Sequence, residues 1–264
     1  MSEERVSVSI EEHVAVVALT RPDRHNALDL AMLDAIIAAA ERLRAEAGVR
    51  AVVLHGAGKS FCWGLVFPAV AAAGGLEGFT AVLDEPPPNY FQRAAYGWIQ
   101  VPVPVVAAIH GNCFGGGLQI ALAADIRIAT RDARLSVMEG RWGLIPDMSI
   151  TRTLTRLVGI DVAKELTYTA RVISGDDAYR LGMVTHLHED PLEVALTLAR
   201  EIASKSPDAV RGAKQLFDEG WTGTPAETLA LEAKLQGELI GTANQLTAVT
   251  AALAKQEPEF TDPV

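Results

Sequence analysis

Residues 104–130 spell PVVAAIHGNCFGGGLQIALAADIRIAT. The β-branched and small apolar residues at 105–109 predict a buried strand. Three glycines at 115–117 then lead into residues 118–124, which have the composition of a helix, and residues 126–129 predict a further strand. A strand, a helix and a second strand at this spacing predict a parallel pair joined by a crossover.

The segments before this run have the same pattern. Residues 6–10 and 14–19 predict a hairpin that leads into the core. Asp29 is placed to cap a helix over residues 30–43, and residues 51–54 predict the next buried strand. We therefore expect an α/β protein with a largely parallel sheet. Further short strands are predicted at residues 135–137 and 183–187, and further helices at residues 151–158 and 163–169.

The composition changes after Pro191, where strand patterns end. Helices are predicted over residues 192–204, 209–219 and 225–253. We therefore expect two parts: residues 1–205 form the α/β core that binds the substrate, and residues 206–264 form a helical C-terminal region.

Composition and charge exclude several classes of protein. The chain has 264 residues, 49% hydrophobic and 21% charged, which is enough to bury a sizeable core. Its net charge of -10 argues against a nucleic-acid partner. Residues 94–124 carry no charged side chain, but their prolines and polar residues indicate buried core rather than a membrane span. With two cysteines, predicted to be free thiols, and no signal-like start, we expect a cytoplasmic protein.

The glycine triplet is a candidate ligand site. Glycines before a helix leave backbone N–H groups open to a phosphate or a developing oxyanion. The alternative is a tight turn in which helix and strand backbones touch. Gly64, after the strand at residues 51–54, marks a second candidate donor segment. We find no pattern of a P-loop, a dinucleotide-binding turn, a nucleophile elbow or a clustered metal site.

A second unusual stretch is MEGRWGLIPD at residues 138–147. It places Glu139 and Asp147 eight residues apart among mostly apolar residues, glycine and proline. Burial against Trp142 and Leu144 would raise the pKa of both carboxyl groups and suit them to proton transfer. The alternative is that Asp147 only caps a helix that starts near Ser149.

Motifs along nearly the whole chain resemble the enoyl-CoA hydratase/isomerase family, also called the crotonase family. Each motif is loose alone, but their order and spacing are specific. They are LTRPDRHNALDLAML (19–33), VRAVVLHGAGKSFCWGLV (49–66), the glycine segment (104–130), TRLVG (155–159), LTYTARVISGDDAYRLGMVTHL (166–187) and KQEPEF (255–260).

The resemblance implies a crotonase-like spiral of ββα units with a C-terminal helical trimerisation region. It implies an acyl-CoA thioester substrate, a homotrimer or a dimer of trimers, and no metal or cofactor apart from the CoA of the substrate. The N–H groups of Leu65 and Gly116 would form the oxyanion hole. The resemblance also implies substrate-binding roles for Arg24, Ala27, Trp63, Gln119, Trp142, Lys255 and Phe260. Residues 69–83 and 86–98 are expected to line or cover the pocket.

The chain departs from the family pattern in three places. Gln119 stands where hydratases have the first of two glutamates, twenty residues before Glu139, and an amide cannot act as a carboxylate base. Trp63 replaces a small residue near the expected CoA site. Lys255 matches the family's basic ending, but Gln256 and Glu257 replace cations.

Glu139 and Asp147 resemble the acid pair of the Δ3,5-Δ2,4-dienoyl-CoA isomerases. We therefore expect isomerisation of a (di)enoyl-CoA by a proton relay, with enoyl-CoA hydration through Glu139 alone as the alternative. Another crotonase-type reaction, such as dehalogenation, thioester hydrolysis or C–C cleavage, fits less well, because dehalogenases have a tryptophan where Glu139 stands. A non-enzymatic acyl-CoA binder would not need the acids, and the net charge disfavours RNA binding.

Overall fold

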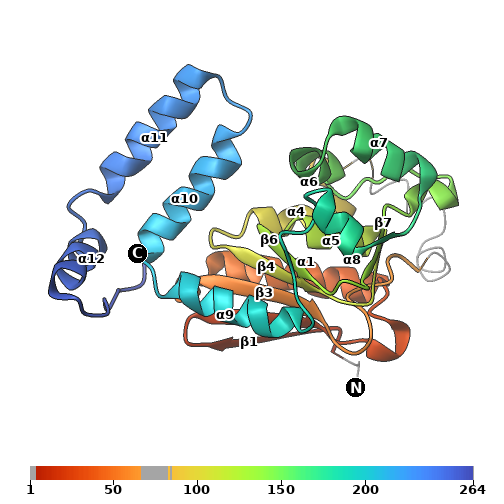
Figure 1. Ribbon diagram of the computed structural model, residues 1–264, viewed down its shortest axis with the longest axis horizontal. Coiled ribbons are helices and arrows are strands. Elements are labelled where there is room, and N and C mark those ends of the chain that lie inside the picture. The colour runs from red at the N-terminus through yellow and green to blue at the C-terminus, as the bar shows by residue number, and fades with distance from the viewer. Residues whose placement is uncertain (1–3, 67–82, 84, 264) are drawn as a thin grey trace.

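A computed structural model describes residues 4–66, 83 and 85–263 (Figure 1). Within these residues, the main sheet has six strands. They are β1 (Val6–Glu11), β2 (Val14–Leu19), β3 (Ala51–Gly56), β4 (Val105–Ile109), β6 (Ile126–Ala129) and β9 (His186–Leu187), in the order β1-β2-β3-β4-β6-β9. β1 and β2 are antiparallel and every later pair is parallel. The predicted hairpin and parallel crossovers are therefore confirmed.

Different helices cover the two faces of this sheet. α1 (Leu30–Ala45) connects β2 to β3, and its cap Asp29 accepts a hydrogen bond from the Met32 N–H at 2.8 Å. It packs with α4 (Tyr90–Ile99) over one face. α9 (Pro191–Ala203) covers the other face through a row of buried alanines. Because both faces are buried, the central strands are apolar at consecutive positions.

A smaller sheet brings the glycine turn beside the segment that precedes Leu65. Within the described chain it contains β5 (Asn112–Phe114), β7 (Arg134–Ser136) and β8 (Ile173–Ser174). β4, β5 and α5 (Gly116–Leu122) form one ββα unit, as β1, β2 and α1 do. Isolated parallel β-bridges, formed by backbone hydrogen bonds, pair Cys62 with Cys113 and Leu28 with Leu65. Both cysteines are buried free thiols, as predicted.

The described part of the core also contains short helices outside the two sheets. They are the 3-10 helices η1 (Pro22–Arg24) and η2 (Glu139–Trp142), and the helices α6 (Ile150–Leu157), α7 (Ile160–Thr169) and α8 (Gly175–Arg180). The uncharged run at residues 94–124 is core, as predicted, with Trp98, Ile109 and Leu118 at most 1% exposed. No helix in the part of the chain that the structure describes is long and apolar enough to cross a membrane.

The C-terminal helices extend away from the sheet (Figure 1). They are α10 (Pro207–Gly220), α11 (Pro225–Leu239) and α12 (Ala243–Ala254). The prediction of one helical run over residues 225–253 is wrong, because Gly241 has a φ of 82° and Thr242 caps a new helix. The predicted boundary at residue 205 falls between α9 and α10, and it stays a prediction.

Two further expectations need correction. α4 was missed as a helix, although Asn89 and Gln92 form a capping box at its start. α5 begins at Gly116, two residues before the predicted start, because the glycines themselves take up helical geometry. Residues 67–82 and 84 lie outside the described residues, and with them most of the expected pocket segment at residues 69–83.

Candidate active site

The glycine triplet forms the turn from β5 into α5. Gly115 has a φ of 51°, which favours glycine, and its N–H donates to the Ser136 carbonyl at 3.0 Å. A Cβ at Gly117 would lie 2.6 Å from the Cβ of Cys62, so the backbones here pack too closely for a side chain. The N–H of Gly116 has no hydrogen-bond partner in the described chain. The turn is therefore both tight and open to a ligand.

A second open N–H belongs to Leu65. Leu65 and Leu28 form a parallel bridge in which the Leu28 N–H donates to the Gly64 carbonyl at 2.8 Å. This pairing leaves the Leu65 N–H without a partner among the residues described. Gly64 has a φ of 90°, and a Cβ there would lie 2.7 Å from the Phe114 carbonyl oxygen. Leu65 and Gly116 line the same cavity.

We expect Gly64→Ala to destabilise the protein by about 1–3 kcal/mol, because alanine is strained at this φ and the Phe114 carbonyl is fixed backbone. Urea denaturation would measure the loss. The matched control is Gly237→Ala inside α11, where a Cβ meets no atom within 4 Å. That change should stabilise the helix by about 0.5–1 kcal/mol. Equal effects of the two changes would contradict the close approach at Gly64.

The cavity between these segments has a volume of about 270 Å³ and mostly apolar walls. Among the described residues it is lined by Trp63, Gly64, Leu65, Leu83, Phe91, Gly115, Gly116, Met138, Glu139, Trp142, Leu144, Ile145, Asp147 and Met148. The two carboxyl groups singled out in the sequence therefore face one apolar space, beside two open backbone donors.

Glu139 lies at the start of η2, on the wall of this cavity. Its Oε1 accepts a hydrogen bond from Nε2 of Gln119 at 2.7 Å. Its Oε2 is buried and has no hydrogen-bond partner among the described residues. Burial raises the pKa of Glu139, and the charge of Asp147 raises it further, while the Gln119 hydrogen bond lowers it in part. The carboxyl group therefore keeps one buried oxygen available to a ligand.

Asp147 is not a helix cap. α6 begins at Ile150 after Ser149, which has a φ of 67°, and no side chain caps the first turn. In the part of the chain described, Asp147 makes no hydrogen bond to that turn. The capping alternative is therefore wrong. Burial raises the pKa of Asp147. The structure thus leaves its carboxyl group free to face the cavity.

The apolar residues between the two acids are more exposed than predicted. Trp142 is 60% exposed and Leu144 is 40% exposed, so the expectation that they enclose the acids is wrong for this chain. They still line the cavity. Phe91 and Met148, each 4% exposed, also line it. Phe91 lies in the segment 86–98 that was expected to line or cover the pocket, although neither residue was singled out individually. The apolar spacing of α4 could have indicated Phe91.

Of the other predicted substrate-binding residues, Trp63 lies at the cavity and Gln119 lies next to it. Trp63 lines the cavity and packs its ring against His25 and Phe114, with centroids 5.1 and 5.6 Å apart. Gln119 is 1% exposed and lies behind Glu139 rather than on the cavity wall.

The cavity described above is not lined by Arg24, Ala27, Lys255 or Phe260. Arg24 is exposed, 3.7 Å from Asp23, and Ala27 is buried. Lys255 directly follows α12, and the Phe260 carbonyl accepts a hydrogen bond from Arg50 at 2.9 Å. Arg50 also donates to the carbonyl of Ala203, the last residue of α9. CoA binding by these residues stays a prediction.

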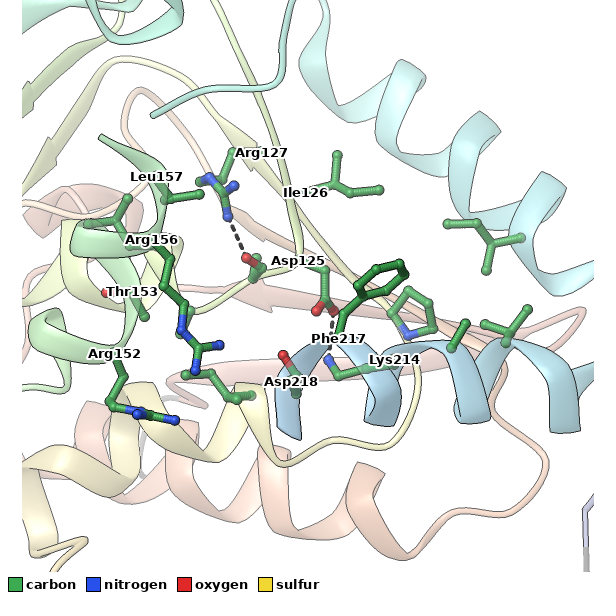
Figure 2. Close-up of a pocket in the computed structure, with 18 of the residues that line it drawn as sticks. Asp125, Ile126, Arg127, Arg152, Thr153, Arg156, Leu157, Lys214, Phe217 and Asp218 are labelled. Carbon is green, nitrogen blue, oxygen red and sulfur yellow. Dashed lines mark hydrogen bonds and ion pairs between the residues drawn. The ribbon is translucent and has the colours of Figure 1, made fainter. Parts of the chain in front are cut away.

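A larger cavity of about 480 Å³ lies where α10 meets the core (Figure 2). Asp125 points toward Lys214 there, and their ion pair measures 2.6 Å. Asp125 also accepts the Val105 N–H at 2.7 Å, which commits it to a structural role. No glycine turn lines this cavity within the described chain. We therefore place the candidate active site at the cavity that Glu139 and Asp147 line.

Comparisons with known proteins show which family this chain and its fold resemble. The enoyl-CoA hydratase/isomerase family model matches residues 9–263. A short-chain-enoyl-CoA hydratase of Clostridium acetobutylicum is 35% identical over 256 residues, 94% of each chain. A mitochondrial Delta(3,5)-Delta(2,4)-dienoyl-CoA isomerase of Mus musculus is 31% identical over 262 residues, 94% of this chain and 79% of the relative. The crystal structure of an enoyl-CoA hydratase from Bacillus anthracis superposes with a TM-score of 0.90 at 33% identity, covering 97% of this chain and 98% of that one.

Proposed function

Because the chain belongs to the enoyl-CoA hydratase/isomerase family, we propose that it isomerises the double bonds of a dienoyl-CoA thioester through Glu139 and Asp147. The acyl chain occupies the apolar cavity, and its thioester oxygen accepts hydrogen bonds from the N–H groups of Leu65 and Gly116. Two donors fixed before the reaction stabilise the enolate more than the neutral thioester.

The reaction needs one proton removed and one proton delivered. In a 3,5-dienoyl thioester, a carboxylate takes a proton from C2, and the electrons shift so that double bonds form at C2–C3 and C4–C5. A protonated carboxyl group then delivers a proton to C6. The product is the 2,4-dienoyl thioester, with no gain of water. The chemistry therefore requires two carboxyl groups along one flat chain.

The observation that carries the proposal is the shared apolar cavity of Glu139 and Asp147. Burial raises the pKa of each, and the charge of Asp147 raises the pKa of Glu139 further, so ionising both carboxyl groups together is disfavoured. Two features support the same assignment: Oε2 of Glu139 has no partner among the residues that the structure describes, and Asp147 makes no capping hydrogen bond there.

Hydration of a 2-enoyl-CoA is the second candidate, since several relatives bear the name enoyl-CoA hydratase. It would use Glu139 alone, because Gln119 cannot accept a proton. The test is the ratio of kcat/KM for a 3,5-dienoyl-CoA to that for a 2-enoyl-CoA of equal length. We expect the dienoyl substrate to be preferred by at least roughly tenfold, which corresponds to about 1.4 kcal/mol. A preference for the enoyl substrate would favour hydration.

A homotrimer or a dimer of trimers is the assembly that we expect in solution. The C-terminal helices expose large apolar side chains: Phe217 is 72% exposed, Leu229 61% and Leu253 82%. Apolar surface of this kind indicates contact with another copy. Light scattering at micromolar concentration should give three or six times the protomer mass of 28.1 kDa. A monomeric mass would contradict this prediction.

A further inference from the structure

Gln119 uses both ends of its amide inside the protein. Its Nε2 donates to Oε1 of Glu139 at 2.7 Å, and its Oε1 accepts the N–H of Met148 at 2.8 Å. The side chain is 1% exposed. The Met148 N–H can only donate, so it must face the oxygen of the amide, and the NH₂ group must face Glu139. Hydrogen-bond chemistry therefore fixes the orientation of this amide.

We propose that Gln119 is a positioning residue that joins the two acid-bearing segments, by holding Glu139 on one side and the residue after Asp147 on the other. This inference rests on the proposed function and adds to it a residue that sets the spacing of the two proton-transfer groups. Gln119 does not line the cavity, so it acts through its neighbours and not on the substrate.

The consequence for Glu139 is that its two oxygens have different roles. The hydrogen bond from Gln119 occupies Oε1, whereas the buried Oε2 has no partner in the described chain. Because an amide NH₂ donates a proton in a hydrogen bond but does not accept one, Gln119 cannot exchange protons with Glu139. Proton transfer is therefore directed to Oε2. The donated bond also favours the ionised form, which partly offsets the burial that raises the pKa of Glu139.

The consequence for Asp147 concerns the backbone. Ser149 adopts a φ of 67° and α6 begins without a side-chain cap, so helix capping does not hold this segment. The hydrogen bond from the Met148 N–H to Gln119 is buried and directly adjoins Asp147. A substitution of Gln119 should therefore displace both acids, although the Gln119 side chain does not itself line the cavity.

Two variants distinguish the hydrogen bond that Gln119 donates to Glu139 from the one that it accepts from the Met148 N–H. Gln119→Met has a similar size and removes both bonds. Gln119→Glu keeps an acceptor for the Met148 N–H but replaces the donor to Glu139 with a like charge. We expect kcat for the dienoyl substrate to fall by roughly 10²-fold in both, with KM nearly unchanged, because misplaced groups react slowly. The matched control is Gln215→Met, because the exposed amide of Gln215 donates to Glu219 at 3.0 Å and makes no other side-chain hydrogen bond among the described residues.

The decisive readout is the titration of Glu139 itself, which needs no substrate. Carboxyl-¹³C glutamate NMR would follow its pKa, with Glu139→Gln to assign the resonance. We expect Gln119→Met to raise this pKa by about one unit, because a hydrogen bond to the carboxylate is lost, and Gln119→Glu to raise it further, because a like charge is added. Gln215→Met should leave it unchanged.

Unchanged titration in a folded Gln119→Met protein, with only a lower melting temperature, would overturn the proposal and reduce Gln119 to a packing residue. If the expected order of pKa values holds but the wild-type protein does not turn over a dienoyl-CoA, the positioning role stands and the proposed reaction fails. The two parts of the account are therefore separately testable.

Discussion

Glu139→Gln should lower the kcat for a 3,5-dienoyl-CoA by roughly 10²–10⁴-fold, the usual contribution of a general acid or base. Glutamine has nearly the same shape and can still accept the hydrogen bond from Gln119, but it can neither take nor deliver a proton. The substrate should therefore bind almost as before, so KM should change little. Steady-state kinetics with the purified variant would measure both constants.

The stability of the same variant distinguishes lost chemistry from lost structure. Burial raises the pKa of Glu139 in the folded protein above its ordinary value of 4.5. The folded state therefore binds a proton more tightly than the unfolded state, and the contribution of Glu139 to stability falls as the pH rises through the folded pKa. Ionising this buried carboxyl group costs stability, and the glutamine variant removes that cost.

Urea denaturation at pH 4 and pH 7 follows this contribution. We expect Glu139→Gln to be at least as stable as the wild type at pH 7, with its relative advantage smaller at pH 4. A variant that is inactive and also clearly less stable at pH 7 would show that Glu139 supports the fold, and its loss of activity would then not identify a catalytic group.

Asp147→Asn should also lower kcat by roughly 10²–10⁴-fold, because the relay needs a carboxyl group at each end of the diene. Its melting temperature should stay close to that of the wild type, since Asp147 does not cap α6. A variant that keeps full dienoyl activity would exclude Asp147 from the relay.

A pair of alanine variants provides the matched control. Asp190 is a true cap, because its Oδ1 accepts the N–H groups of Leu192 and Glu193 at 3.1 and 3.0 Å. Asp190→Ala should cost about 1 kcal/mol of stability and leave turnover unchanged. Asp147→Ala should lower turnover strongly and leave stability nearly unchanged. The same response of both variants would remove the distinction between a capping and a reacting aspartate.

The sheet and the glycine turn could be predicted because their causes are local. Consecutive β-branched and small apolar residues indicate strands buried on both faces, and the structure pairs β2, β3, β4 and β6 in parallel. The eight-residue spacing of Glu139 and Asp147 likewise marked two acids in one segment, and both line one cavity.

The remaining features depend on contacts distant in sequence. Nothing near Gln119 indicates that its amide joins Glu139 to the Met148 N–H, because those partners lie 20 and 29 residues further along the chain. The capping alternative for Asp147 looked reasonable because a helix does begin three residues later. The structure shows that Ser149, with a φ of 67°, precedes α6 and that no described side chain makes a capping hydrogen bond to its first turn.

The most direct test of the Glu139–Asp147 relay is the turnover of a 3,5-dienoyl-CoA in D₂O, followed by NMR and mass spectrometry of the product. The account predicts a 2,4-dienoyl-CoA with deuterium at C6, delivered from a carboxyl group that exchanges with solvent, and with no added water. It also predicts that Asp147→Asn slows the appearance of this product. A product that has gained water, or a 2,4-dienoyl-CoA without deuterium at C6, would contradict it.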